Sequence, residues 1–383
     1  MKHNKRVAIA LGAGYTPGIN SIIMGAAIAA HNSGWDVVGI QDGFEGLLFP
    51  DQYKNGGLID LGPEVIKKLN PAESDALGTS ASMDPFNIRT ENELGMIEEI
   101  DMSDTLLANL KKEKIDGVIA IMMGRGLSIL YKLNRKGLKS VCIPRTVEND
   151  MVATAVAFGF NTALSFTIDM LDRAHQAAKS ARKIGVVEIL GSQSGWLALQ
   201  SGIAVMADVV VIPEIPCDIA KLAKHMKNKV TKDRPYGLVV VAEGANFLEK
   251  ESKIKKEEDQ LKKALSPLAT GDDDSYVINR SGKASETLAL GLQQILAEEV
   301  YPLVLGPWTR GGVATAVDRQ LGLAYGAGAV RALDAGQYNT IMAFVPPAIK
   351  FVPLEDSLNK VRIVSADNEF IKTANSLGIY TGA

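Results

Sequence analysis

Short apolar runs alternate with amphipathic or small-residue segments along most of the chain. In the first half, buried strands are predicted at residues 6–11, 36–40, 117–123 and 140–143. Helices are predicted between them at residues 20–32, 102–113 and 127–134. This alternation is typical of an α/β fold with a parallel, doubly wound sheet.

The second half repeats the same alternation. A long helix at residues 161–183 leads into strands predicted at residues 184–190, 208–212, 236–241 and 340–345. Further helices are predicted at residues 196–206, 285–299 and 317–334. The charge-rich stretch at residues 247–263 and the Gly/Asp cluster at 270–275 predict a solvated helix and a surface loop rather than a domain linker.

Composition limits the partners and the compartment. The chain has 383 residues, of which 46% are hydrophobic and 22% charged, enough for two or three globular domains. A net charge of −3 gives no electrostatic reason to expect nucleic acid or a membrane as partner. Cys142 and Cys217 lie beside apolar runs and match no metal-ligand spacing. We therefore expect both thiols to be buried. The sequence has no run of roughly 20 apolar residues, so we expect a cytoplasmic protein.

The first predicted strand ends in a glycine-rich turn that leads into a helix, Gly-Ala-Gly-Tyr-Thr-Pro-Gly-Ile-Asn at residues 12–20. Backbone N–H groups in such a turn and the positive end of the helix dipole form an anion-binding arrangement. The spacing matches neither the dinucleotide fingerprint nor the P-loop. Phosphate binding is the favoured interpretation, and a tight turn without a ligand is the alternative.

Other predicted strands end in loops of related composition. These loops lie at residues 124–126, 144–150, 191–195, 213–214, 243–246 and 310–312. Glycines let backbone N–H groups reach phosphate oxygens, arginines neutralise them, and carboxylates accept a proton or hold a metal. Together the loops indicate phosphoryl transfer, in which a protein mainly positions donor and acceptor.

Each loop also has a structural interpretation. Taken alone, the segment at residues 144–150 is better interpreted as a solvated surface turn. An ion pair to Glu148 or Asp150 explains Arg125 nearly as well as phosphate binding does, and an acid after a strand, such as Glu214, more commonly caps a neighbouring helix.

The order of these loops resembles the 6-phosphofructokinase family over nearly the whole chain. Pro-Arg-Thr-Val-Glu-Asn-Asp at residues 144–150 is similar to the family's Pro-(Lys/Gly)-Thr-Ile-Asp-Asn-Asp. Related fragments stand at residues 15–20, 158–163, 187–191 and 305–312. Residues 195–199 and 240–245 resemble the branch that includes pyrophosphate-dependent enzymes.

The resemblance implies a fold and a domain division. It implies two Rossmann-like, doubly wound domains with mostly parallel sheets. Residues 1–159 with about 311–353 would form the phosphoryl-donor domain. Residues 160–310 with about 354–383 would form the domain that binds the acceptor, a sugar phosphate.

The resemblance also implies roles for individual residues. Catalytic roles fall to Glu148 as base, Asp150 as an orienting or metal-associated acid, Thr146 and Arg145. Donor binding falls to Gly14, Gly18, Gly124, Arg125 and Gly126. Acceptor binding falls to Lys183, Gly191, Ser192, Glu243, Tyr301 and Arg310. Magnesium is the implied cofactor, and a homodimer or homotetramer, in which Lys183 acts across subunits, is the implied assembly.

The chain departs from the family pattern at several of these positions. The family's magnesium-binding aspartate falls on Gly124, and Arg125 stands where ATP-dependent members have glycine. Arginines expected on the sugar-phosphate side fall on Ala81, Ser192 and Tyr301. The proposed base is Glu148 rather than aspartate.

These observations leave several functions open. The favoured one is transfer of a phosphoryl group from pyrophosphate or ATP to a sugar phosphate, with fructose 6-phosphate as default acceptor. One alternative is a catalytically silent homologue that acts as a regulatory subunit or small-molecule sensor. Another is a kinase with a different sugar acceptor.

Overall fold

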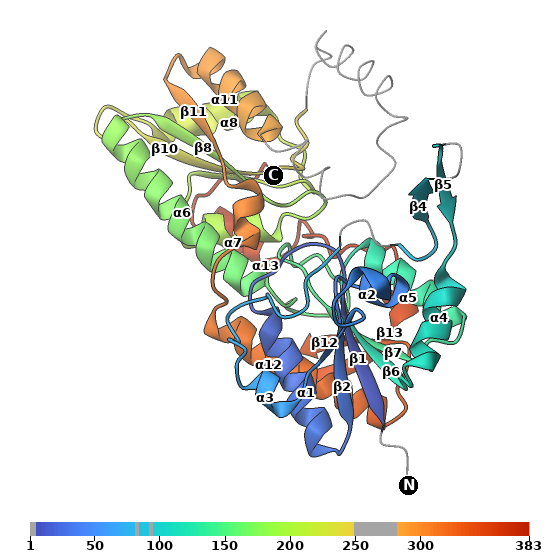
Figure 1. Cartoon of the computed structure of the whole chain (residues 1–383). Coiled ribbons are helices and arrows are strands. Elements are labelled where there is room, and N and C mark those ends of the chain that lie inside the picture. Colours follow the sequence, from blue (N-terminus) through green and yellow to red (C-terminus); the bar gives the residue numbers. More distant parts are fainter. Residues whose placement is uncertain (1–4, 81–83, 92–94, 249–281, 383) are drawn as a thin grey trace. The chain divides into compact units, whose positions relative to one another are not determined.

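The chain divides into two compact units. The first unit comprises Met1–Val147, Met151–Thr162 and Arg310–Lys360, and the second comprises Glu148–Asp150, Ala163–Thr309 and Val361–Ala383. The structure is a computed structural model that describes residues 5–80, 84–91, 95–248 and 282–382 (Figure 1). The segments predicted as a solvated helix and a Gly/Asp loop lie almost wholly outside these residues, as does Ala81.

The first unit contains a seven-stranded sheet whose inner strands pair in parallel and whose two edge strands pair antiparallel. In spatial order the strands are β13 (Ala348–Pro353), β12 (Thr340–Val345), β7 (Ser140–Pro144), β6 (Gly117–Met122), β1 (Arg6–Leu11), β2 (Asp36–Ile40) and β3 (Leu58–Asp60). The inner strands are mostly apolar because both faces of the sheet are covered.

Helices cover both faces of this sheet, as strand β1 illustrates. Val7, Ile9 and Leu11 pack in the core formed with α1 (Ile19–Asn32) and α12 (Ala316–Asp334). The intervening residues of β1 face the core formed with α4 (Ser103–Lys112) and α5 (Arg125–Arg135), as the two-residue period of a strand requires. Short helices α2 (Glu45–Leu48) and α3 (Pro63–Ile66) and three 3₁₀ turns complete the connections of the described chain.

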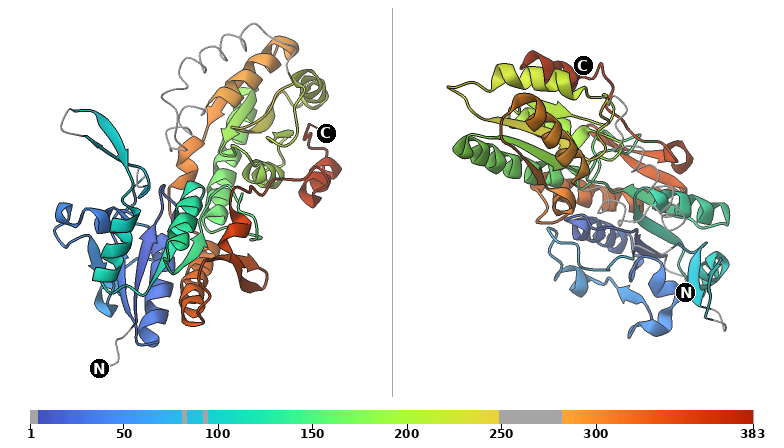
Figure 2. Two further views of the ribbon diagram at one scale, coloured as in Figure 1. Left: turned by 90° about the vertical axis from the view of Figure 1, so that its right-hand side faces the viewer. Right: turned by 90° about the horizontal axis from the view of Figure 1, so that it is seen from above.

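A separate two-stranded hairpin leaves this unit. Strands β4 (Ile88–Glu91) and β5 (Ile97–Ile100) pair with each other antiparallel and project as a teal ribbon (Figures 1 and 2). Side chains of β5 are exposed along its whole length. The sequence pattern did not predict this hairpin.

The second unit contains a four-stranded sheet that is parallel throughout. In spatial order the strands are β11 (Val300–Val304), β8 (Ile184–Ile189), β10 (Gly237–Ala242) and β9 (Val209–Val211). In the described ranges the remaining helices are α6 (Phe160–Ala181), α7 (Trp196–Ala204), α8 (Ile219–Lys229), α11 (Lys283–Leu296) and α13 (Glu369–Ser376). Two parallel-sheet units confirm the predicted α/β class with mostly parallel sheets.

The boundaries of the units differ from the predicted division, and residues 160–162 and Arg310 belong to the first unit rather than the second. The chain returns to the second unit at Val361 rather than near residue 354, and Glu148–Asp150 belong to the second unit although the flanking residues belong to the first. Both cysteines are free and buried, one in each unit. Burial raises the pKa of each thiol to about 12. Among the described residues no helix is long and apolar enough to cross a membrane.

A buried carboxylate fixes the start of α6. Asp318, in the first turn of α12, accepts hydrogen bonds from the backbone N–H of Gly159 at 3.0 Å and of Thr162 at 2.7 Å. It also accepts one from the Thr162 hydroxyl. Desolvation raises the pKa of Asp318, while the three hydrogen bonds oppose that rise.

Asp318→Asn is expected to lower the free energy of unfolding by about 1–3 kcal/mol, because the new amide N–H₂ faces donors where a carboxylate oxygen accepted. Because the folded-state pKa is raised, the stability contributed by Asp318 is full below the unfolded pKa and is lost as pH rises through the folded pKa. The difference in the free energy of unfolding between the wild type and Asp318→Asn should therefore become smaller as pH rises. Urea unfolding measures this difference. The control is Asp334→Asn. Asp334 is the last residue of the same helix, α12, and forms an exposed ion pair with Lys5. A difference that widens with pH would contradict this assignment.

Candidate active site

The predicted loops of the first unit follow neighbouring strands. Strands β1, β6 and β7 are adjacent and parallel, so the loops after Leu11, Met122 and Pro144 leave the same edge of the sheet. This is the edge at which open α/β sheets bind ligands.

Arg145 organises the first of these loops. Its side chain is fully buried and donates hydrogen bonds to the carbonyl oxygens of Gly12, at 3.2 Å, and of Ala13 and Gly14. The sequence predicted that Arg145 neutralises a phosphate. In the structure its guanidinium is directed at the backbone of the loop.

This arrangement has a consequence for the loop's donors. In a planar trans peptide the N–H points opposite to the C=O. The N–H groups of Ala13, Gly14 and Tyr15 are therefore directed away from Arg145. Within the described chain these three N–H groups have no recorded hydrogen bond. Each of these N–H groups can donate to an acceptor outside the loop, such as a phosphate oxygen.

The first backbone N–H groups of α1, by contrast, donate within the protein. The N–H of Ile19 donates to the Ser74 hydroxyl at 2.9 Å, and that of Asn20 donates to the Glu73 carbonyl at 3.0 Å. The carbonyl of Gly18 accepts from Ser21. The first donors of the helix are thus satisfied within the protein.

The loop after β6 carries an ion pair that the sequence did not reveal. Arg125 begins α5, and its Nη2 lies 2.7 Å from Oδ2 of Asp84, which is largely buried. The predicted alternative partners of Arg125 were Glu148 and Asp150, and the observed partner is Asp84. The side chain of Arg125 remains about half exposed (46%), so it keeps access to solvent.

Glu148, the predicted base, is held by a loop of the second unit. Its side chain is 7% exposed, and its Oε2 accepts a hydrogen bond from the backbone N–H of Ser192 at 3.2 Å. Ser192 follows β8, and the next loop of the same sheet edge packs directly against it. A Cβ on Gly244 would lie 2.0 Å from the Ser192 carbonyl oxygen, so only glycine fits there.

Glu214 has the capping role that was one of its expected interpretations. Both of its carboxylate oxygens accept from the N–H of Gly195, at 2.9 and 3.1 Å, and Gly195 precedes the first residue of α7. Oε1 also accepts from the N–H of Val364 at 2.8 Å. This carboxylate therefore fixes the end of the Ser192 loop.

The predicted acceptor residues divide between the two ends of the second sheet. Gly191, Ser192 and Glu243 follow the carboxyl ends of β8 and β10. Lys183 precedes β8 and pairs with Glu299. Tyr301 pairs with Gly185 near the start of β11.

A strand of six residues spans about 20 Å. One chain therefore does not bring Lys183 beside Ser192, and a shared role would need a second copy. The hydroxyl of Tyr301 is buried with no hydrogen-bond partner in the described chain. Burial raises the pKa of Tyr301, and the nearby charge of Lys183 only partly opposes this rise.

Thr146 and Arg310 are two further predicted site residues. Thr146 is buried and its N–H donates to the carbonyl of Phe158. Arg310, which ends a 3₁₀ turn, belongs to the first unit.

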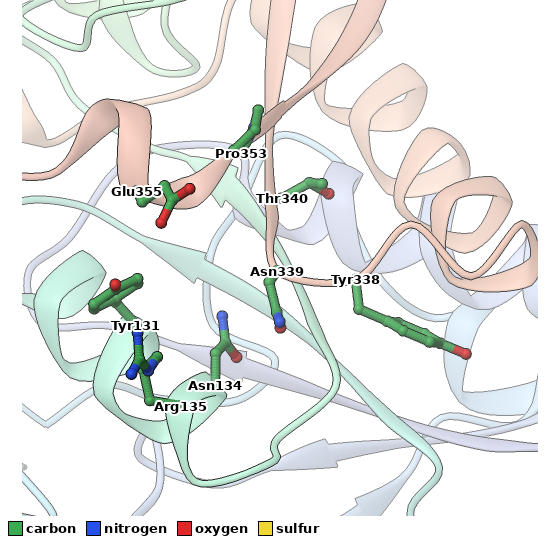
Figure 3. Close-up of a pocket in the computed structure, with 8 residues that line it drawn as sticks. All are labelled: Tyr131, Asn134, Arg135, Tyr338, Asn339, Thr340, Pro353 and Glu355. Carbon is green, nitrogen blue, oxygen red and sulfur yellow. The ribbon is translucent and has the colours of Figure 1, made fainter.

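A pocket of about 310 Å³ in the first unit lies elsewhere (Figure 3). Its walls come from the end of α5, the start of β12 and the end of β13, with Tyr131 and Asn134 on one side and Thr340 and Pro353 on the other. The pocket therefore lies at the amino-terminal end of β12, and the end of α5 that lines it leads into the amino-terminal end of β7. The pocket is thus at the sheet edge opposite to the Arg145 loop.

Comparison with known proteins agrees with the order of these loops. A family model described as Phosphofructokinase matches residues 6–333. ATP-dependent 6-phosphofructokinase 2 of Clostridium perfringens is 32% identical over 381 residues, covering 99% of each chain. ATP-dependent 6-phosphofructokinase of Corynebacterium efficiens is 33% identical over 360 residues, covering 94% of this chain and 95% of that one.

The chain belongs to the phosphofructokinase family.

Solved structures agree in fold. Pyrophosphate-dependent phosphofructokinase from Marinobacter aquaeolei superposes with a TM-score of 0.73 at 19% identity, covering 99% of this chain and 92% of that one. Phosphofructokinase from Saccharomyces cerevisiae gives 0.70 at 24% identity, covering 92% of this chain and 45% of that one. At these identities the likeness concerns the fold alone.

The loop after β6 of this phosphofructokinase-family chain does not fit a magnesium ion held by protein ligands. The position of the implied metal aspartate is Gly124, and the neighbouring carboxylate of Asp84 is paired with Arg125. Among the described residues no group of three or more His, Cys, Asp or Glu side chains is placed to hold a metal. The metal role of Asp150 stays a prediction.

Proposed function

We propose that this chain transfers a phosphoryl group from a phosphoanhydride, ATP or pyrophosphate, to a hydroxyl of a sugar phosphate, with fructose 6-phosphate as the default acceptor. The observation that carries the proposal is the buried carboxylate of Glu148 in the acid–Asn–acid segment, held by the Ser192 N–H. Membership of the phosphofructokinase family and full-length similarity to proteins named ATP-dependent 6-phosphofructokinase support it.

In the proposed reaction Glu148 takes the proton of the acceptor hydroxyl. The hydroxyl oxygen forms a bond to the transferred phosphorus, and the bond from that phosphorus to the leaving phosphate or ADP breaks. The proton passes from Glu148 to solvent after product release. Glutamate performs the same proton chemistry as the family's aspartate, from one methylene farther along the side chain.

The donor side is proposed to use backbone N–H groups rather than a metal aspartate. The N–H groups of Ala13, Gly14 and Tyr15 would donate to phosphate oxygens, and Arg125, oriented by Asp84, would neutralise their charge. On the acceptor side we propose Glu243 and Arg310. Magnesium accompanies ATP or pyrophosphate in the assay, and no step is assigned to it.

Restoring the missing aspartate is expected to strain the chain. Gly124 has φ +48° and ψ −123°, a conformation that side-chain-bearing residues avoid, although the space around it is open. Gly124→Asp should lower the free energy of unfolding by about 1–3 kcal/mol, measured by urea denaturation. Gly34→Asp is the control, because Gly34 also has open space but a φ of +73°, in the left-handed region that aspartate tolerates. Equal stability of the two variants would contradict this explanation of Gly124.

A second candidate function is a catalytically silent regulatory subunit or sensor. It is favoured by Gly124 at the metal position and Ser192 where the family has arginine.

An assay distinguishes the two. The purified chain is incubated with magnesium, either ATP or pyrophosphate, and a panel of sugars and sugar phosphates, with phosphorus NMR detecting products. A phosphorylated sugar product supports the proposed transferase. No product with either donor, while a sugar phosphate still binds by calorimetry, rejects the transferase and supports the sensor.

A further inference from the structure

The C-terminal segment, Val361–Ala383, contacts the acid segment, Glu148–Asp150, through Arg362. The backbone N–H of Arg362 donates to the carbonyl of Asp150 at 2.6 Å. Its Nη1 donates to the carbonyl of Asn149 at the longer distance of 3.4 Å. Both the main chain and the side chain of this residue therefore contact the two residues that follow Glu148.

Arg362 also contacts the loop that holds the carboxylate of Glu148. Its carbonyl accepts from the Ser194 hydroxyl at 3.0 Å and from the indole N–H of Trp196 at 2.9 Å. Its guanidinium lies 4.2 Å from the centre of the Trp196 ring. A stacked cation of this kind contributes about 0.5–2 kcal/mol, more where water is excluded.

These contacts close a network around Glu148. Ser192, whose N–H binds the Glu148 carboxylate, stands two residues before Ser194 in the same loop. The far end of that loop is fixed because Glu214 binds both Gly195 and Val364, two residues beyond Arg362. The C-terminal segment is thus joined to both segments that determine where the carboxylate lies.

We propose that Arg362 is a positioning residue for Glu148, and this rests on the proposed function of that carboxylate. The guanidinium holds the acid segment and the Ser192 loop in one arrangement, so that the base keeps a fixed position. Desolvation lowers the pKa of Arg362, although arginine stays charged at neutral pH. This role was not predictable from the sequence, because the contact with Asn149 spans 213 residues.

Side-chain variants test the guanidinium alone, because the bonds of the Arg362 N–H and C=O persist in them. Arg362→Met keeps the length but removes the charge, the stacking and the bond to Asn149. We expect kcat to fall roughly 10- to 100-fold with a smaller change in KM for the donor. Arg362→Lys keeps the charge without the planar stacking and should recover only part of the loss.

Hydrogen exchange gives a readout that does not depend on turnover. In Arg362→Met the amides of residues 191–196, which include the Ser192 donor, should exchange faster than in the wild type. Arg234→Lys is the matched control for Arg362→Lys, because Arg234 also stacks on an aromatic ring in this unit, 4.7 Å from the centre of Tyr236. The control should change neither kcat nor exchange in this loop.

The outcomes separate this inference from the proposed function. Unchanged exchange at residues 191–196 in Arg362→Met overturns the positioning role, whatever the activity. Faster exchange with a lower kcat supports it. If the wild type transfers no phosphoryl group, the proposed function fails, and Arg362 is then rejected as a positioning residue for catalysis even if exchange becomes faster.

Discussion

Glu148→Gln is expected to lower kcat for phosphoryl transfer by about 100- to 10,000-fold, because a carboxamide cannot accept the proton of the acceptor hydroxyl. The free energy of unfolding should change little. The amide oxygen of glutamine can still accept the hydrogen bond that the Ser192 N–H now donates to Oε2. Steady-state rates and urea unfolding of the same preparations measure both quantities.

Glu148→Asp is the matched control for this variant. It keeps a carboxylate but withdraws it by one methylene, so it should lose less activity than the glutamine variant. A glutamine variant that retains the wild-type kcat would remove Glu148 from the mechanism. Equal losses in the two variants would mean that position rather than proton transfer limits the rate.

Arg145→Met is expected to have the largest effect on stability, a loss of roughly 3–5 kcal/mol. The guanidinium is fully buried, and its removal leaves the carbonyls of Gly12, Ala13 and Gly14 without their charged donor. The N–H groups directed away from Arg145 then also lose their fixed orientation. The affinity for inorganic pyrophosphate should also fall. Calorimetry on the folded variant measures this affinity.

Arg125→Met is the comparison for this loss. Arg125 is about half exposed and pairs with a single carboxylate, Asp84. Its removal should cost less, about 1–2 kcal/mol, because solvent reaches Arg125 and because Asp84, although largely buried, keeps the hydrogen bonds from the Phe86 N–H and the Asn87 amide. Similar losses in the two variants would contradict the buried organising role assigned to Arg145.

Much of the fold could be predicted from the sequence because the inner strands are buried on both faces. Runs such as those of β6 and β10 are apolar throughout, and this pattern does not depend on distant contacts. The edge strand β13 and the hairpin strand β5 were missed. None of their residues is fully buried, and charged residues interrupt the apolar positions in both strands.

The candidate site was only partly predictable. Strand-end loops and Glu148 follow from local composition and from family resemblance. The partner of Arg125 lies 41 residues away in the sequence, and Arg362 contacts a segment more than 200 residues before it. Such pairs are decided by tertiary packing. The same reason explains why Arg145 suggested a phosphate ligand, although it bonds to the backbone of the first loop.

Transfer of label from a radiolabelled donor to fructose 6-phosphate tests the central claim most directly. Wild type and Glu148→Gln are run side by side, with labelled ATP and with labelled pyrophosphate, and the sugar product is isolated. We predict a labelled sugar bisphosphate from the wild type with at least one donor, and its formation at least about 100-fold more slowly with the variant. The absence of labelled product with both donors, or equal rates for the two proteins, would contradict phosphoryl transfer with Glu148 as base.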